Sequence, residues 1–178
     1  MTFHILPRAA FVCLLLWQID NPFVQAQEAA MTAIPSSIKA EHEELHKELA
    51  KAIASGGRTS EAAHAVEAVL GPHFKKEEIY AMPPLGLLAP LSRGETTPDM
   101  RSILALTDRL EADMPTMLSE HQKIHAALVR LAETAKAENK ADVADFAERL
   151  SHHAQNEEEI LYPAALLVGR YVRLKLGQ

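Results

Sequence analysis

Apolar residues recur every three or four positions along most of the chain, a spacing that predicts amphipathic α-helices rather than strands. A first helix is expected from Ser36 or Ser37, either of which would cap it, to about Ala54, where Ser55-Gly56-Gly57 ends it. Two histidines lie in its apolar stripe, which consists of Ile38, His42, Leu45, His46, Leu49 and Ile53. Both histidines are therefore expected to point inward.

A second helix is expected to begin at Thr59 or Ser60 and to end at the Pro83-Pro84 pair. Gly71-Pro72 inside it predicts a kink. The apolar face of this helix carries a histidine and a glutamate four positions apart, and it consists of Val66, Leu70, His73, Glu77, Tyr80 and Ala81.

The second half of the chain begins after a proline- and glycine-rich connection at residues 83–97. A helix that starts at Thr97-Pro98-Asp99 is expected to break or bend at Pro115. The third long helix is therefore predicted from about Asp113 to about Ala137, with His121 and His125 on its apolar face.

A fourth helix is predicted from about Asn139 to Pro163, with His153 and Glu157 on its apolar face. After Pro163, an apolar tail from Ala164 to Leu176 is expected to form a short helix that covers one end of the molecule. No stretch has the alternating pattern of a strand.

The polar residues on these apolar faces form a repeat, in which HxxxH is followed by HxxxE. The residues are His42, His46, His73 and Glu77 in the first half and His121, His125, His153 and Glu157 in the second. The interval from His42 to His73 is 31 residues, and that from His121 to His153 is 32. Side chains four positions apart project from the same side of a helix, so each pair suits one metal ion. We therefore expect an all-α, up-down-up-down four-helix bundle made of two helix-loop-helix units.

This arrangement resembles the hemerythrin-like, or HHE cation-binding, family of four-helix bundles, over roughly Ser36 to Pro163. The resemblance implies a non-haem di-iron centre bridged by two carboxylates and an oxo or hydroxo group. It also implies roles for particular side chains: Glu77 and Glu157 as the bridges, and His42, His73, His121, His125 and His153 as further iron ligands.

Two features depart from the oxygen-carrying hemerythrins. Their last helix has HxxxxD, whereas this chain has HxxxE, which is more similar to the symmetric HHE branch with its more varied activities. His46 lies where the family usually has an apolar residue. By the internal repeat it corresponds to His125 and is either an eighth ligand or a histidine that hydrogen-bonds to a bridging glutamate.

Charge, the N-terminal segment and the cysteine content limit which partners, location and metal ligands are expected. A net charge of −6 without a basic patch makes nucleic acid and anionic membrane surfaces poor candidates as partners, so no nucleic acid partner is expected. Residues 1–26 have the features of an export signal: an apolar run from Ala9 to Ile19, then Val24-Gln25-Ala26 before the expected cleavage point. The single cysteine, Cys13, lies inside this signal, so a mature chain would bind metal through nitrogen and oxygen atoms only.

The expected layout is therefore a signal peptide at 1–26, a flexible lead at 27–35 and the bundle at 36–178. The chain is expected to be exported, to the periplasm or the medium, with no stable membrane insertion after cleavage.

The leading hypothesis is a metal-binding protein whose di-iron centre binds a small oxidant or gas, namely O2, NO or peroxide. The same centre could instead belong to an enzyme that consumes peroxide or nitric oxide or oxidises ferrous iron, but no dedicated proton shuttle or substrate pocket is identified. The third class is a bundle that sequesters iron or zinc, or one that only contacts a partner. A structural zinc needs four ligands, fewer than the repeat offers.

Overall fold

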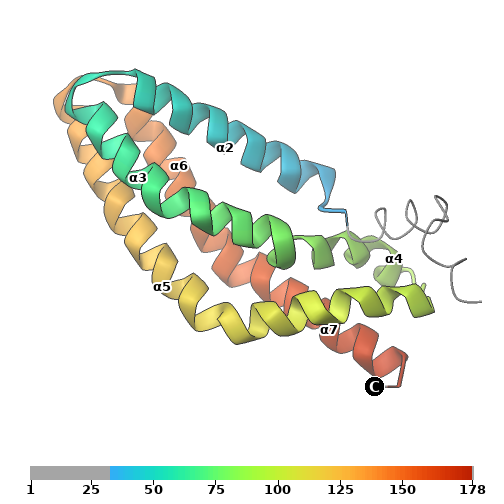
Figure 1. Ribbon diagram of the computed structural model, residues 1–178. Helices are drawn as coiled ribbons and strands as arrows, with labels where there is room; N and C mark the ends of the chain where they lie inside the picture. Colours follow the sequence, from blue (N-terminus) through green and yellow to red (C-terminus); the bar gives the residue numbers. More distant parts are fainter. Residues whose placement is uncertain (1–32, 178) are drawn as a thin grey trace, which may run out of the picture.

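The computed structural model describes residues 33–177, in which the regular elements are all helices. Four long helices run alternately in opposite directions (Figure 1): α2 (Ser36–Ala54), α3 (Gly57–Lys76), α5 (Ser102–Ala137) and α6 (Ala141–Asn156). This arrangement is consistent with the four-helix bundle that the sequence predicts. Helix α5 contacts both α3 and α6, and α2 contacts α3 and α6.

Two of the long helices continue beyond the bundle through a π-helical turn. After α3 come the π-helix η1 (Glu77–Ala81), the 3-10 helix η2 (Pro83–Leu87) and α4 (Leu88–Ser92). After α6 come the π-helix η4 (Glu157–Leu161) and α7 (Tyr162–Lys175). Pro163 lies in the first turn of α7, where its missing N–H costs little, so the chain stays helical past it.

The third long helix begins earlier than the sequence predicts. The 3-10 turn η3 (Pro98–Arg101) leads directly into α5, which passes through Pro115 without ending, so the predicted start near Asp113 is wrong. Pro115 has no N–H for the carbonyl of Glu111, but both residues are exposed, so water can replace this hydrogen bond. The helix bends in its middle (Figure 1), and its continuation packs against α7.

The helix starts also differ from expectation. Helix α2 begins at Ser36, but the residue before it is Pro35 and no side chain caps it, so the predicted serine cap is not present. Helix α3 begins at Gly57, two residues before the predicted Thr59. The carboxylate of Glu138, from the far end of α5, accepts hydrogen bonds from the backbone N–H groups of Arg58 and Thr59 and so caps α3.

The buried polar residues lie between two apolar clusters. One cluster fills the bundle between α2, α3, α5 and α6, and includes Leu49, Leu70, Phe74, Leu128 and Leu150. The second joins α5 and α7 to the turn after α3, and includes Tyr80, Met82, Leu110, Met117 and Tyr162. The helices of the described range include none long and apolar enough to cross a membrane.

Candidate metal centre

Six of the eight predicted ligands lie buried at one level of the bundle. They are His42, His73, Glu77, His121, His153 and Glu157, each no more than 5% exposed. Helices α2 and α5 contribute one histidine each, while the other four residues come from the two HxxxE motifs at the ends of α3 and α6. The predicted convergence of all four helices on one buried centre is therefore observed for these six side chains.

The six side chains form two groups with one shared member. In the His73 group (His73, Glu77, His121 and Glu157), one possible ligand atom from each residue lies within 4.8 Å of the others. The His42 group (His42, His153 and Glu157) meets the same condition. Each group could hold one metal ion.

Both buried carboxylates face both groups. Glu157 places Oε2 3.4 Å from His121 Nε2 and Oε1 2.8 Å from His153 Nε2. Glu77 places Oε1 3.3 Å from His73 Nε2 and Oε2 4.0 Å from His42 Nε2. A carboxylate with one oxygen toward each of two cation positions has the arrangement of a bridging ligand.

The two glutamates share a backbone feature. Each is the first residue of a π-helical turn, where the N–H of Met82 or Tyr162 bonds to the carbonyl five residues earlier, on Glu77 or Glu157. Such turns interrupt α-helices mostly at functional sites, because they shift the side chains that follow.

The donor set fits a metal ion. Four buried atoms have no hydrogen bond of good geometry to the described chain: Nε2 of His42, Oε2 of Glu77, Nε2 of His153 and Oε1 of Glu157. The last two face each other at 2.8 Å as an ion pair when His153 is protonated. An unsatisfied buried polar atom costs about 1–3 kcal/mol, and more if charged. Cations bound to the two groups would take these atoms as ligands and remove that cost.

A family model, the hemerythrin HHE cation-binding domain, matches residues 33–165. The match spans most of the chain and includes all six buried donors. The chain belongs to the hemerythrin HHE cation-binding family. Comparisons with characterised proteins and with solved structures found no match.

In this HHE domain every inward histidine has a glutamate beside its outer nitrogen. Three of these contacts have hydrogen-bonding distances from Nδ1: 2.9 Å from His73 to Glu120, 2.8 Å from His121 to Glu158 and 3.0 Å from His153 to Glu41. His42 Nδ1 lies 3.8 Å from Glu78. A carboxylate at Nδ1 keeps the proton there and directs the lone pair of Nε2 toward the centre.

From the sequence alone these four glutamates are expected to be surface charges, with Glu78 or Glu158 as an alternative that orients a ligand histidine. They are indeed partly exposed, but each lies next to a buried donor in the chain, in the pairs Glu41-His42, Glu77-Glu78, Glu120-His121 and Glu157-Glu158. The signal that would have found them is that these dipeptides recur at equivalent places in both halves. Tyr162 was missed as well, and its hydroxyl reaches Glu77.

Protons balance the buried carboxylates in the metal-free chain. Burial disfavours the charged form of His153, but the carboxylates of Glu157 and Glu41 outweigh burial and raise its pKa to about 9. Burial likewise opposes charge on Glu157, yet the surrounding imidazoles hold its pKa well below the usual range. Burial and the negative charge of Glu157 raise the pKa of Glu77.

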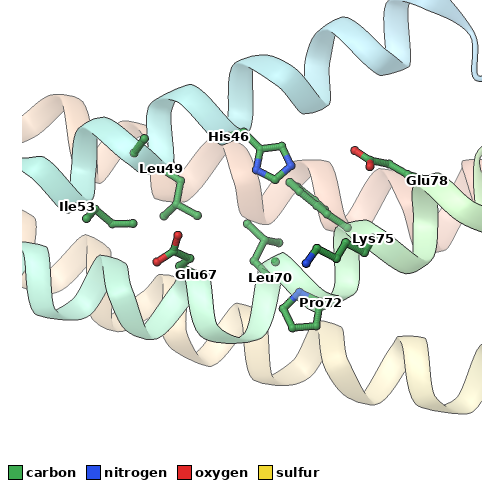
Figure 2. A pocket seen from close by; sticks show the side chains of 11 residues that line it. His46, Leu49, Ile53, Glu67, Leu70, Pro72, Lys75 and Glu78 are labelled. Atoms are coloured by element: carbon green, nitrogen blue, oxygen red, sulfur yellow. The ribbon is translucent and has the colours of Figure 1, made fainter.

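The structure places the other two predicted ligands, His46 and His125, outside both groups. Both are exposed, so the expectation that they point inward is wrong. The His46 ring lies edge-on 5.0 Å from Phe74 and reaches over the pocket between α2 and α3 (Figure 2). His125 bonds through Nδ1 to Ser151 Oγ at 2.9 Å.

The physical reason is the pitch of the helix. Four residues advance about 6 Å along the axis and rotate about 40° beyond one turn. The histidine four residues after His42 or His121 therefore lies nearer to the apolar cluster that contains Phe74 and Leu128. The additional rotation turns its imidazole to the bundle surface. A glutamate one turn after His73 or His153 remains at the centre because α3 and α6 run the opposite way.

Proposed function

We propose that this chain is an exported, non-haem di-iron protein that binds a small oxidant or gas, namely O2, NO or peroxide. The observation that carries the proposal is the pair of carboxylates, Glu77 and Glu157. Each has one oxygen toward a histidine of the His73 group and the other toward a histidine of the His42 group. Two cation positions that share carboxylates suit a dinuclear centre better than a single structural zinc, which would use the four donors of the His73 group and leave His42 and His153 without a metal.

The choice of iron comes from the resemblance to hemerythrin-like proteins, and the ligand chemistry is compatible with it. Four imidazoles and two carboxylates form a nitrogen-rich set without sulfur, which suits iron as well as zinc and copper. Iron bound there would supply reversible redox chemistry and a coordination position for a diatomic or peroxide ligand. The protein side chains would hold the ions, orient the imidazoles through the outer glutamates and exclude bulk water with the apolar clusters on either side.

Export is proposed from the signal-like residues 1–26, which lie outside the described residues, as do most of the lead at 27–35. The mass of protein recovered from the periplasm or the medium tests it, and a chain that begins at Gln27 is expected. A chain of full mass retained in the cell would contradict export without affecting the metal proposal.

The metal proposal is tested by elemental analysis and absorption spectra of protein from iron-supplemented cells. We expect about two irons per chain, and a spectrum that changes when the reduced protein meets O2 or NO. His73→Ala should lower the iron content to about one or less, since His73 lies in the His73 group.

The matched control is His46→Ala, which removes a histidine four residues from His42 but outside both groups. This variant should keep both irons, and loss of iron from it would show that His46 is a ligand. Zinc alone, or no metal, would overturn the di-iron proposal. Iron without any response to O2, NO or peroxide would instead favour sequestration.

A further inference from the structure

The hydroxyl of Tyr162 lies inside the His73 group. Tyr162 is the first residue of α7, and its side chain is 1% exposed. Its Oη lies 3.3 Å from His73 Nε2 and 3.3 Å from His121 Nε2, and it donates a hydrogen bond to Glu77 Oε1. The three contacts are to atoms that face the proposed cation position.

The two distances from Tyr162 Oη to the imidazoles match those between ligands on one metal ion. With metal–ligand bonds of about 2.1 Å, neighbouring donor atoms are about 3.0 Å apart in an octahedron and about 3.4 Å apart in a tetrahedron. The Tyr162 Oη contacts with both imidazoles fall in this range, as does the 3.3 Å between His73 Nε2 and Glu77 Oε1. The phenol oxygen is therefore already at the position of a further ligand.

Hydrogen bonding accounts for only one of the three contacts of Tyr162 Oη, the one to Glu77. The single proton of the hydroxyl goes to Glu77, and the Nδ1 protons of the two imidazoles go to Glu120 and Glu158. In neutral rings both Nε2 atoms then present lone pairs toward the lone pairs of the Tyr162 oxygen. Three electron-rich atoms that converge without a proton between them form a site for a cation.

The His42 group has no equivalent. The residue nine positions after the HxxxE histidine is Tyr162 in the second half of the chain but Met82 in the first. Met82 and Tyr162 belong to the same apolar cluster, but Met82 offers only a thioether, which is a weak ligand for iron. Because of Tyr162, the His73 group has an oxygen donor that the His42 group lacks.

We propose that Tyr162 binds iron through its phenolate oxygen at the position of the His73 group. The phenolic proton is released to solvent when the iron binds. The iron of the His42 group, which has fewer protein ligands, is then the one with room for the external small molecule. This inference rests on the proposed di-iron function.

Absorption and resonance Raman spectra of the iron(III)-loaded protein test the inference. A bound phenolate gives a phenolate-to-iron charge-transfer band in the visible, and excitation in that band enhances tyrosinate ring vibrations. We expect both signals in the wild-type protein. Tyr162→Phe should lose both while keeping at least half of the iron, because the histidines and carboxylates remain.

The matched control is Tyr80→Phe. Tyr80 is also fully buried, but its hydroxyl bonds to Asp113 Oδ2 at 2.5 Å and lies outside both groups. This variant should keep the visible band and the Raman signals. If Tyr162→Phe gives the same spectra as the wild-type protein, the inference is overturned and Tyr162 is only a hydrogen-bond donor to Glu77.

A second measurement covers the case in which Tyr162→Phe does not fold. Replacing all tyrosines of the wild-type chain with 3-fluorotyrosine should shift the charge-transfer band, because fluorine lowers the energy of the phenolate orbital. A wild-type protein with iron but without tyrosinate signals would overturn this inference alone. A protein without iron would overturn the proposed function first, so the two failures are distinguishable.

Discussion

The four glutamates beside the inward histidines give this centre an outer layer of charge. Glu41, Glu78, Glu120 and Glu158 are exposed or partly exposed, yet each lies within 4 Å of an Nδ1 atom of the centre. Two of these contacts link the halves of the chain, since Glu41 bonds to His153 and Glu120 to His73. The imidazoles are thus oriented by residues outside the ligand motifs.

The Glu158 carboxylate lies 2.8 Å from His121 Nδ1. Glu158→Gln should weaken metal binding by about 10- to 100-fold, because an amide supplies no negative charge to this nitrogen. Competition with a chelator of known affinity measures the change. The control is Glu159→Gln, because the Glu159 carboxylate accepts a hydrogen bond from the exposed Gln155 and contacts no histidine among the described residues. Equal affinities for the two variants would show that Glu158 has no orienting role.

Metal binding at pH 7 should release protons. With its pKa raised to about 9, His153 is protonated in the metal-free chain, and an imidazole must be neutral at Nε2 to bind a metal. Apparent affinity should therefore rise with pH, by up to about tenfold per unit for one proton, until about pH 9.

Calorimetry in two buffers of different ionisation enthalpy counts the protons. Glu41→Gln removes one of the charges that raise this pKa and should lower the number released at pH 8. Heats that do not depend on the buffer would contradict the prediction.

The start of α3 depends on a residue from another helix. Glu138, the residue after α5, accepts hydrogen bonds from Arg58 N at 2.9 Å and Thr59 Oγ1 at 2.7 Å, and Lys140 Nζ lies 2.9 Å away. Anions stabilise a helix N-terminus, where N–H groups lack partners within the helix. Helix α3 is thus fixed to the end of α5 at the opposite end of the bundle from α7 (Figure 1).

Glu138→Gln should lower the Tm by about 2–5 °C at neutral pH, since a weaker acceptor replaces a charged cap. Lys140 and the α3 hydrogen bonds lower the pKa of Glu138 from 4.5 to about 2. A lowered pKa stabilises the fold above the unfolded-state value, and this contribution is lost as the pH falls from about 4.5 to about 2.

The Tm difference between wild type and Glu138→Gln should therefore be constant above about pH 5 and shrink below it. Thermal melts followed by circular dichroism between pH 2.5 and 7 measure this. Glu61→Gln, an exposed position of the same helix, serves as the control and should not change the Tm. A difference that persists unchanged at pH 2.5 would contradict the assigned role.

Across the whole molecule, the centre connects all four long helices between two apolar clusters. Side chains from α2, α5 and the ends of α3 and α6 meet at a point where four histidines and two glutamates are buried. Without a cation, a proton on His153 and the hydrogen bond from Tyr162 to Glu77 reduce the repulsion between the buried carboxylates. Folding and metal loading are therefore expected to be thermodynamically linked.

Removing the metal should lower the Tm of the whole bundle by roughly 10 °C. A ligand present at a thousand times its dissociation constant adds about 4 kcal/mol, and each kcal/mol shifts the Tm of a domain of this size by about 2–4 °C. Melts with and without a chelator measure the shift. His46→Ala should show the same shift as wild type, and His73→Ala a smaller one; a chelator without effect on wild type would contradict the linkage.

The fold and most of the centre were accessible from the amino-acid sequence because they depend on local spacing. Helical periodicity predicted the four long helices, and the repeated HxxxE motif identified His73, Glu77, His153 and Glu157. Spacing along one helix could not show which residues of HxxxH lie at the level of the centre. That depends on where the neighbouring helices cross, and so His46 and His125 were misplaced.

The remaining features arise from contacts between distant segments. The helix was expected to break or bend at Pro115. It bends, but α5 stays continuous and packs against α7 on one side and α3 and α6 on the other. Glu138 caps a helix that begins 81 residues earlier, at Gly57. Tyr162 follows its motif in the chain yet contacts His73 and His121 of other helices. Local spacing specifies which residues share a helix face, whereas long-range packing sets which faces meet.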